Sequence, residues 1–212
     1  MLVTLDASGS APEPFITAPS PNGVDVGGNV IRYPLAEGYD LDYSVESNQV
    51  KQNLVLREVP VLPEAAEYFG LSEGLRMPVG YALFSGETML GEEIFKTQED
   101  LQIRNIETGE LLVEIPAPMI MEAGAEEPYM GTFFVQVYGP EILLITVVES
   151  DWLLDEDRVY PVAIDPSIRV NSNAGGYCYI YYAYCYSSAY RYHYRYYGCL
   201  LYTSPSPRDT PQ

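Results

Sequence analysis

The chain alternates apolar and polar residues over several short stretches. In residues 39–45, YDLDYSV, the odd-numbered positions are apolar or aromatic, and the even-numbered positions are Asp, Asp and Ser. Successive side chains of a strand point to opposite faces, so this stretch predicts a half-buried antiparallel strand. A second strand is predicted over residues 50–59, where Leu54 and Leu56 share one face and Val55 and Arg57 share the other.

Two hairpins are predicted farther along the chain. Residues 101–105 and 111–115 flank Gly109, which can take the positive φ that a tight turn needs. Residues 133–138 and 141–148 flank Gly139 and Pro140 in the same way. The only helical signal is Pro63–Phe69, with proline at a tolerated first-turn position and a glycine as the stop. That stretch is short enough to be only a turn.

Short strands separated by Gly and Pro predict an all-β fold, either an antiparallel β-sandwich or an open barrel. We expect this domain to span residues 29–170. Residues 1–28 contain the clusters SGSAPEPF and APSPNG, which favour a linker or an irregular lead-in.

The segment Trp152–Ile168, WLLDEDRVYPVAIDPSI, combines an acidic turn with a strand that contains two prolines. Pro161 and Pro166 cannot donate to a sheet ladder. A strand over residues 159–168 is therefore expected at a sheet edge or crossing between layers. This interpretation makes the segment an architectural joint.

The same segment resembles the end of the β-rich region that precedes the YD-repeat (RHS-type) core of large bacterial secreted and wall-associated proteins, including some polymorphic toxins. YDLDYSV, VKQNLVL and ETGELLVEIPAPMI match that region upstream, in the same order. The chain departs from the family pattern at residues 121–127 and in an acidic insertion around residues 63–74. The resemblance implies a structural signature made of Trp152, Tyr160, Pro161, Val162, Ile164, Asp165 and Pro166.

This resemblance implies a non-catalytic structural or spacer module of a large exported protein that is secreted or displayed at the cell surface. The partner would be the rest of the parent polypeptide. The charge balance agrees with that class, because 30 Asp and Glu face 11 Lys and Arg, for a net charge of −19. Such a surface repels phosphate backbones, so we expect no nucleic-acid partner. No apolar run approaches the roughly 18 residues that a membrane span needs.

Residues 171–198 are rich in tyrosine, and three interpretations of them stay open. They resemble the start of a second, truncated β module of the DNRLRE type. They could equally be a misread sequence, because Tyr, Cys, His and Arg codons differ by single bases. The third interpretation is an aromatic face around Tyr192 and Tyr194 that stacks on a cell-wall or surface glycan. Cys178 and Cys185 can meet only if a turn lies between them.

Residues 199–212 are expected to be an adapter-derived tail. The stretch CLLYTSPSPRD, residues 199–209, resembles the translation of a transposase-type sequencing adapter. A tail of this origin carries no information about the fold.

No catalytic set is predicted. The single histidine, His193, lies in the tyrosine-rich stretch for which three interpretations stay open, so neither a Ser/His/Asp nor a Cys/His arrangement is supported. Paired carboxylates could in principle cleave glycosides, and the acidic residues near the joint are Asp151, Asp155, Glu156, Asp157 and Asp165. Asp151, Asp155 and Asp157 are also weak calcium candidates, although the EF-hand pattern is missing. Solvated turns explain these acids more simply, and we expect no cofactor.

Overall fold

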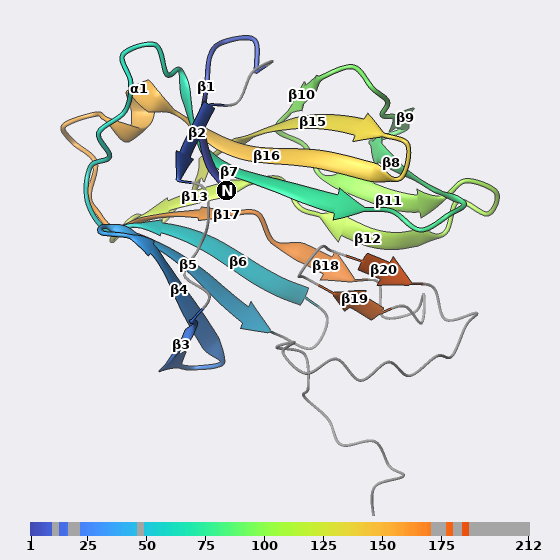
Figure 1. Cartoon of the computed structure of the whole chain (residues 1–212), viewed down its shortest axis with the longest axis horizontal. Coiled ribbons are helices and arrows are strands. Elements are labelled where there is room, and N and C mark those ends of the chain that lie inside the picture. Colours follow the sequence, from blue (N-terminus) through green and yellow to red (C-terminus); the bar gives the residue numbers. More distant parts are fainter. Residues whose placement is uncertain (10–12, 17–21, 46–48, 171–176, 180–183, 187–212) are drawn as a thin grey trace, which may run out of the picture.

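Two sheets of antiparallel strands stack face to face, and this confirms the predicted all-β class. The computed structural model describes residues 1–9, 13–16, 22–45, 49–170, 177–179 and 184–186. In Figure 1, β15, β16 and β7 form the upper layer, and β17, β11 and β12 lie below them.

Sheet A has the strand order β10-β15-β16-β7-β1-β2. Its longest strands, β7 and β16, pair along nine residues from Tyr68–Glu149 to Arg76–Glu141. A hairpin of β19 and β20 joins this sheet through a single parallel pair between Tyr184 and Arg76. The strands are β1 (Leu2–Leu5), β2 (Glu13–Ile16), β7 (Tyr68–Arg76), β10 (Phe95–Thr97), β15 (Thr132–Tyr138), β16 (Glu141–Glu149), β19 (Tyr177–Tyr179) and β20 (Tyr184–Tyr186).

Sheet B is larger, with 12 strands, and it divides at β6. One edge of β6 pairs with β5, which continues to β4 and β3. The other edge pairs with both β17 and β18. The strands are β3 (Val24–Gly27), β4 (Val30–Ala36), β5 (Tyr39–Val45), β6 (Gln49–Leu56), β8 (Tyr81–Ser85), β9 (Thr88–Met89), β11 (Leu101–Asn105), β12 (Leu111–Ile115), β13 (Met119–Glu122), β14 (Tyr129–Met130), β17 (Val162–Asp165) and β18 (Ile168–Val170).

The predicted hairpins are confirmed. β11 pairs with β12, and Gly109 in their turn has a φ of 71°. β15 pairs with β16, and Gly139 has a φ of 59°. The strand predicted at residues 39–45 is β5, which has the expected bounds, and the strand predicted at residues 50–59 is β6, which ends at Leu56.

Two local predictions are wrong. The described part of residues 1–28 contains three strands, and β1 lies fully buried in sheet A between β7 and β2. The buried apolar residues of β1 are Leu2, Val3 and Leu5. The strand was missed because the Pro, Ser and Gly residues that follow it favoured an irregular segment. The suggested helix at Pro63–Phe69 is absent, because Ala66 N donates to Pro63 O in a single turn and β7 begins at Tyr68. The one short helix in the described part of the chain is instead α1 (Ser150–Leu153), which follows β16.

The interior between the sheets holds two apolar clusters. Cluster 1 includes Leu75, Leu83, Leu101, Phe133 and Leu144. Cluster 2 includes Leu2, Leu54, Phe69, Leu71 and Val148. The long strands β7 and β16 contribute to both clusters, so they hold the two halves of the interior together. A third, smaller cluster lies on the other face of sheet A, around Val3, Tyr68, Phe134 and Ile145.

Candidate functional site

The joint segment connects the two layers. It leaves sheet A at the end of β16, turns through α1, and enters sheet B as β17. Val162 and Ile164 on β17 are fully buried in cluster 2. The Tyr160 hydroxyl donates a 2.7 Å hydrogen bond to Leu153 O, which ties the start of β17 back to α1.

Of the two positions predicted for this strand, the sheet edge is wrong, and the crossing between layers is made by the residues before it, between the end of β16 and the start of β17. The strand lies inside sheet B and is split in two, because β17 pairs with β13 and β6 while β18 pairs with β6 and β12. Pro161 immediately precedes β17, and Pro166 falls between β17 and β18. Neither proline occupies a ladder position, so an interior location costs no ladder hydrogen bond.

The split places Asp165 and Ser167 at a fork in sheet B. On one side of the fork the sheet continues through β13 to β14, and on the other it continues through β12, β11, β8 and β9. The Ser167 hydroxyl donates to the Asp165 carboxylate at this point. Asp165 therefore has a specific hydrogen-bond partner in the segment between β17 and β18.

Trp152 is held from two directions by aromatic and cationic groups. Its ring stacks on Tyr129 with a centroid distance of 4.6 Å and an interplanar angle of 13°. The Arg158 guanidinium lies 4.7 Å from the Trp152 ring, within the range of a cation–π interaction. Arg158 also pairs with Glu122 at 3.2 Å, and Val159 N donates to the same carboxylate. Trp152 thus connects α1 to β14 through Tyr129, and to β13 through Arg158 and Glu122.

Among the acidic candidates at the joint, Asp155 binds the local backbone. Asp155 Oδ1 accepts a 2.8 Å hydrogen bond from Asp157 N, as in an Asx turn. Asp151 lies in the first turn of α1. Within the described ranges, no three His, Cys, Asp or Glu side chains are arranged to hold a metal ion, so Asp151, Asp155 and Asp157 are not brought together as one ligand set.

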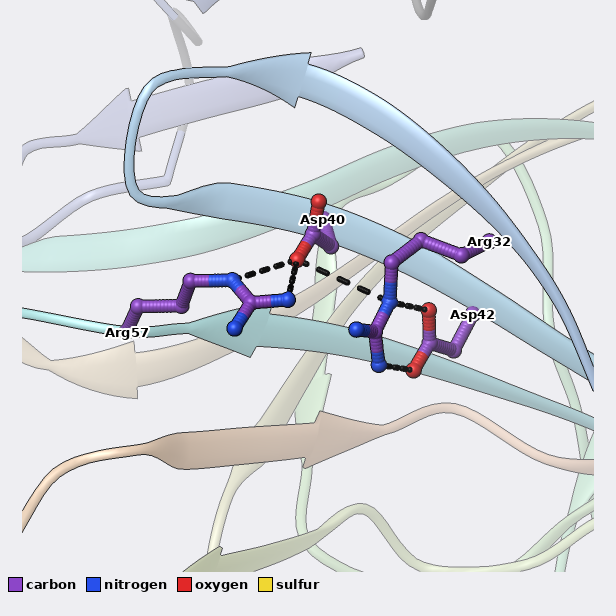
Figure 2. Close-up of polar contacts among 4 residues, drawn as sticks. All are labelled: Arg32, Asp40, Asp42 and Arg57. Carbon is purple, nitrogen blue, oxygen red and sulfur yellow. Dashed lines mark hydrogen bonds and ion pairs between the residues drawn. The ribbon is translucent and has the colours of Figure 1, made fainter. Parts of the chain in front are cut away.

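A second polar cluster lies on the outer face of sheet B, and sequence reasoning missed it. Asp40 and Asp42 on β5 were expected on a solvated face, yet they are only 6% and 9% exposed. Arg32 binds Asp42 with two hydrogen bonds of 2.7 and 2.6 Å. Arg57 binds Asp40 at 2.7 and 2.6 Å, and Arg32 lies 3.6 Å from the same Asp40 oxygen (Figure 2).

These two acids and two arginines neutralise one another. The arginines come from β4 and from the residue just after β6, on either side of β5. Burying a carboxylate is costly unless it is paired and hydrogen-bonded, and each aspartate here meets that condition. The alternation in YDLDYSV reveals the two acids, but nothing local identifies Arg32 and Arg57 as their partners.

A polar pair also bridges the interior. Gln52 on β6 donates a 2.8 Å hydrogen bond from Nε2 to Glu73 Oε1 on β7, so the pair spans sheets B and A. Burial raises the pKa of the Glu73 carboxyl above its ordinary value, while the hydrogen bond from Gln52 and the amino group of Met1 oppose that shift less strongly. Sequence patterns identified neither residue.

The tyrosine-rich stretch is described only in part. Cys178 lies opposite Cys185 in the antiparallel register of β19 and β20. Tyr192 and Tyr194, His193 and the adapter-like residues 199–212 lie outside the described residues. The glycan-stacking prediction therefore stays a prediction.

In the described part of the chain, no helix is both long enough and apolar enough to cross a membrane. Comparison of the chain with protein-family models, with curated proteins and with solved structures gives no match.

Proposed function

We propose that this chain is a non-catalytic structural module of a large exported bacterial protein of the RHS/YD-repeat type. Its location would be extracellular or at the cell surface, and its partner would be the rest of the parent polypeptide. The observation that carries the proposal is the position of the signature segment. The segment links sheet A to sheet B and then pairs with both branches of the fork.

The use of the charged side chains supports the same proposal. The most buried aspartates, Asp40 and Asp42, are bound by arginines, and Glu122 is bound by Arg158. Asp155 and Asp165 accept hydrogen bonds from neighbouring turn residues. Groups that are engaged in this way stabilise strand positions and turns, which is the work expected of a scaffold.

The proposal is tested by asking whether the joint acids affect anything besides stability. The full chain and its Asp155→Asn and Asp165→Asn variants are melted with and without millimolar calcium, and with a panel of soluble cell-wall polysaccharides. We expect no melting shift from either addition and no release of reducing sugar. Asp165→Asn should lower the melting temperature, because the Ser167 hydroxyl loses a charged acceptor.

Three outcomes would contradict the structural role. A calcium-induced rise in melting temperature that Asp155→Asn removes would indicate a metal site. Polysaccharide binding that survives both variants but disappears in a Tyr192→Ala, Tyr194→Ala chain would favour the carbohydrate-binding alternative. Hydrolysis lost in Asp155→Asn or Asp165→Asn would favour a glycosidase.

A further inference from the structure

The two apolar clusters of the interior meet at a row of polar side chains. Along β7, Leu71 belongs to cluster 2 and Leu75 to cluster 1, with Glu73 between them. Along β16, Val148 belongs to cluster 2 and Leu144 to cluster 1, with Thr146 between them. Gln52 faces Glu73 from sheet B. We call Glu73, Thr146 and Gln52 the seam.

The seam spans both sheets. Glu73 lies opposite Leu144, and Thr146 lies opposite Leu71, so Glu73 and Thr146 are diagonal neighbours on the inner face of sheet A. Gln52 on sheet B is 3% exposed and donates to Glu73. The Thr146 hydroxyl is fully buried and has no hydrogen-bond partner. The seam therefore contains an unpartnered hydroxyl at the strand position diagonal to Glu73.

Glu73 lacks the arginine partner that the buried acids Asp40 and Asp42 have. Asp40 and Asp42 are each bound by an arginine, whereas Glu73 is bound by a neutral amide. Among the described residues, no lysine or arginine forms an ion pair with Glu73. A half-buried carboxylate in this setting is costly, and protonation removes that cost.

We propose that Glu73 is a proton-sensitive latch, which holds the two sheets together at the seam when its carboxyl is neutral and loosens them when it ionises. A neutral carboxyl can donate a hydrogen bond as well as accept one, while a carboxylate can only accept. Both forms can accept the hydrogen bond from Gln52, but only the neutral form keeps an unpaired charge out of the half-buried seam. This inference concerns the interior and does not rest on the proposed function.

The direction of the effect follows from linkage. Burial raises the pKa of Glu73 in the folded chain above the ordinary value of 4.5. The folded state thus holds this proton more tightly than the unfolded state. The stabilisation is complete below the ordinary value and is lost as the pH rises through the raised value.

Other titratable groups near Glu73 can be separated from it. Tyr43 on β5 lies opposite Gln52, and burial raises the pKa of its hydroxyl far above the ordinary value, so it stays neutral across the window. The amino group of Met1, which donates to Ser72 O at 3.0 Å, has a pKa lowered by burial. A chain extended by two residues before Met1 moves that amine away and isolates Glu73.

The first experiment measures the titration of Glu73 directly. The full chain is labelled with ¹³C at glutamate side-chain carboxyls, and the Glu73 signal is assigned by its loss in Glu73→Gln or through its own backbone resonances. We expect a midpoint above the ordinary glutamate value in both the original and the extended chain. A midpoint at or below the ordinary value in either chain would overturn the proposal.

The second experiment measures the seam itself. Amide exchange at β6 and β7 is compared between the parent chain and Glu73→Gln at equal pH, so that the intrinsic base catalysis of exchange cancels. We expect a rate ratio near one at low pH and a severalfold faster exchange in the parent chain above the Glu73 midpoint. Glu110→Gln, an exposed control in the β11–β12 turn, should give a ratio that does not change with pH. A constant ratio for Glu73→Gln would contradict the latch.

Discussion

Gly70 on β7 lies directly against the carbonyl oxygen of Thr146 on β16. A Cβ added at Gly70 would approach that oxygen to 1.9 Å and the Cα of Val147 to 2.8 Å. Both neighbours are backbone atoms of the longest strand pair in the molecule, so they cannot move aside as a flexible side chain would. The β7–β16 pair contributes to both interior clusters, and it leaves no room for a side chain at position 70.

Gly70→Ala should therefore destabilise the fold. We expect a loss of about 1–3 kcal/mol or more in the free energy of unfolding, since overpacking displaces the backbone. Gly74→Ala is the matched control on the same strand, because an added Cβ there meets nothing within 4 Å. Glycine costs a strand about 0.5–1 kcal/mol relative to alanine, so Gly74→Ala should be neutral or stabilising. Urea unfolding measures both, and equal losses would refute the close contact.

The Arg32–Asp42 pair should show measurable coupling. A double-mutant cycle with Arg32→Gln and Asp42→Asn should give an interaction free energy on the order of 1–2 kcal/mol, because both hydrogen bonds are charge-assisted and the aspartate is buried. The comparison pair is Arg76–Glu141, separated by 3.4 Å between side chains that are half exposed. Exposed pairs contribute about 0–1 kcal/mol. Similar coupling in the two cycles would count against a special role for the Arg32–Asp42 pair.

Arg158→Lys should change both stability and fluorescence. Lysine keeps the charge that faces Glu122 but loses the planar group that lies over Trp152. We expect a loss of about 1 kcal/mol, within the range of cation–π interactions. The chain has one tryptophan, so a change in tryptophan emission reports on the surroundings of Trp152, which include Arg158 and Tyr129. Arg76→Lys, remote from Trp152 on sheet A, should leave the emission unchanged.

Gly109→Ala tests the turn of the β11–β12 hairpin. Its φ of 71° lies in the left-handed region, where a side chain costs roughly 1–2 kcal/mol. Gly91→Ala is the control, because Gly91 has no positive φ and an added Cβ there meets nothing within 4 Å. Thermal unfolding should separate the two variants, with only Gly109→Ala melting lower. Equal melting temperatures would mean that the turn tolerates alanine.

Sequence patterns identified the elements whose causes are local. The β11–β12 hairpin follows from alternation and from Gly109, and both are visible within fifteen residues. β1 was missed because its place in sheet A depends on pairing with β7, more than sixty residues away. The interior position of β17 was missed because a proline within a strand predicts a sheet edge. Here the strand ends before Pro166 and a new one begins after it, so the proline takes no ladder position.

The candidate sites were harder to predict than the fold. Asp40 and Asp42 are conspicuous in the sequence. Their burial depends on Arg57, just after β6, and on Arg32 in β4. Glu73 lies in the acidic stretch around residues 63–74, and its partner Gln52 comes from the other sheet. Long-range contacts of this kind leave no periodic signal in the sequence.

The measurement that tests the structural role most directly is long-read sequencing of the native locus through and beyond the codons for residues 171–212. We predict an open frame that continues from β18 into YD repeats, with native codons in place of residues 199–212. A native frame that continues into sequence without YD repeats would contradict the proposal that this chain is a module ahead of such a core. A native frame that retains residues 199–212 would contradict the adapter origin of that tail.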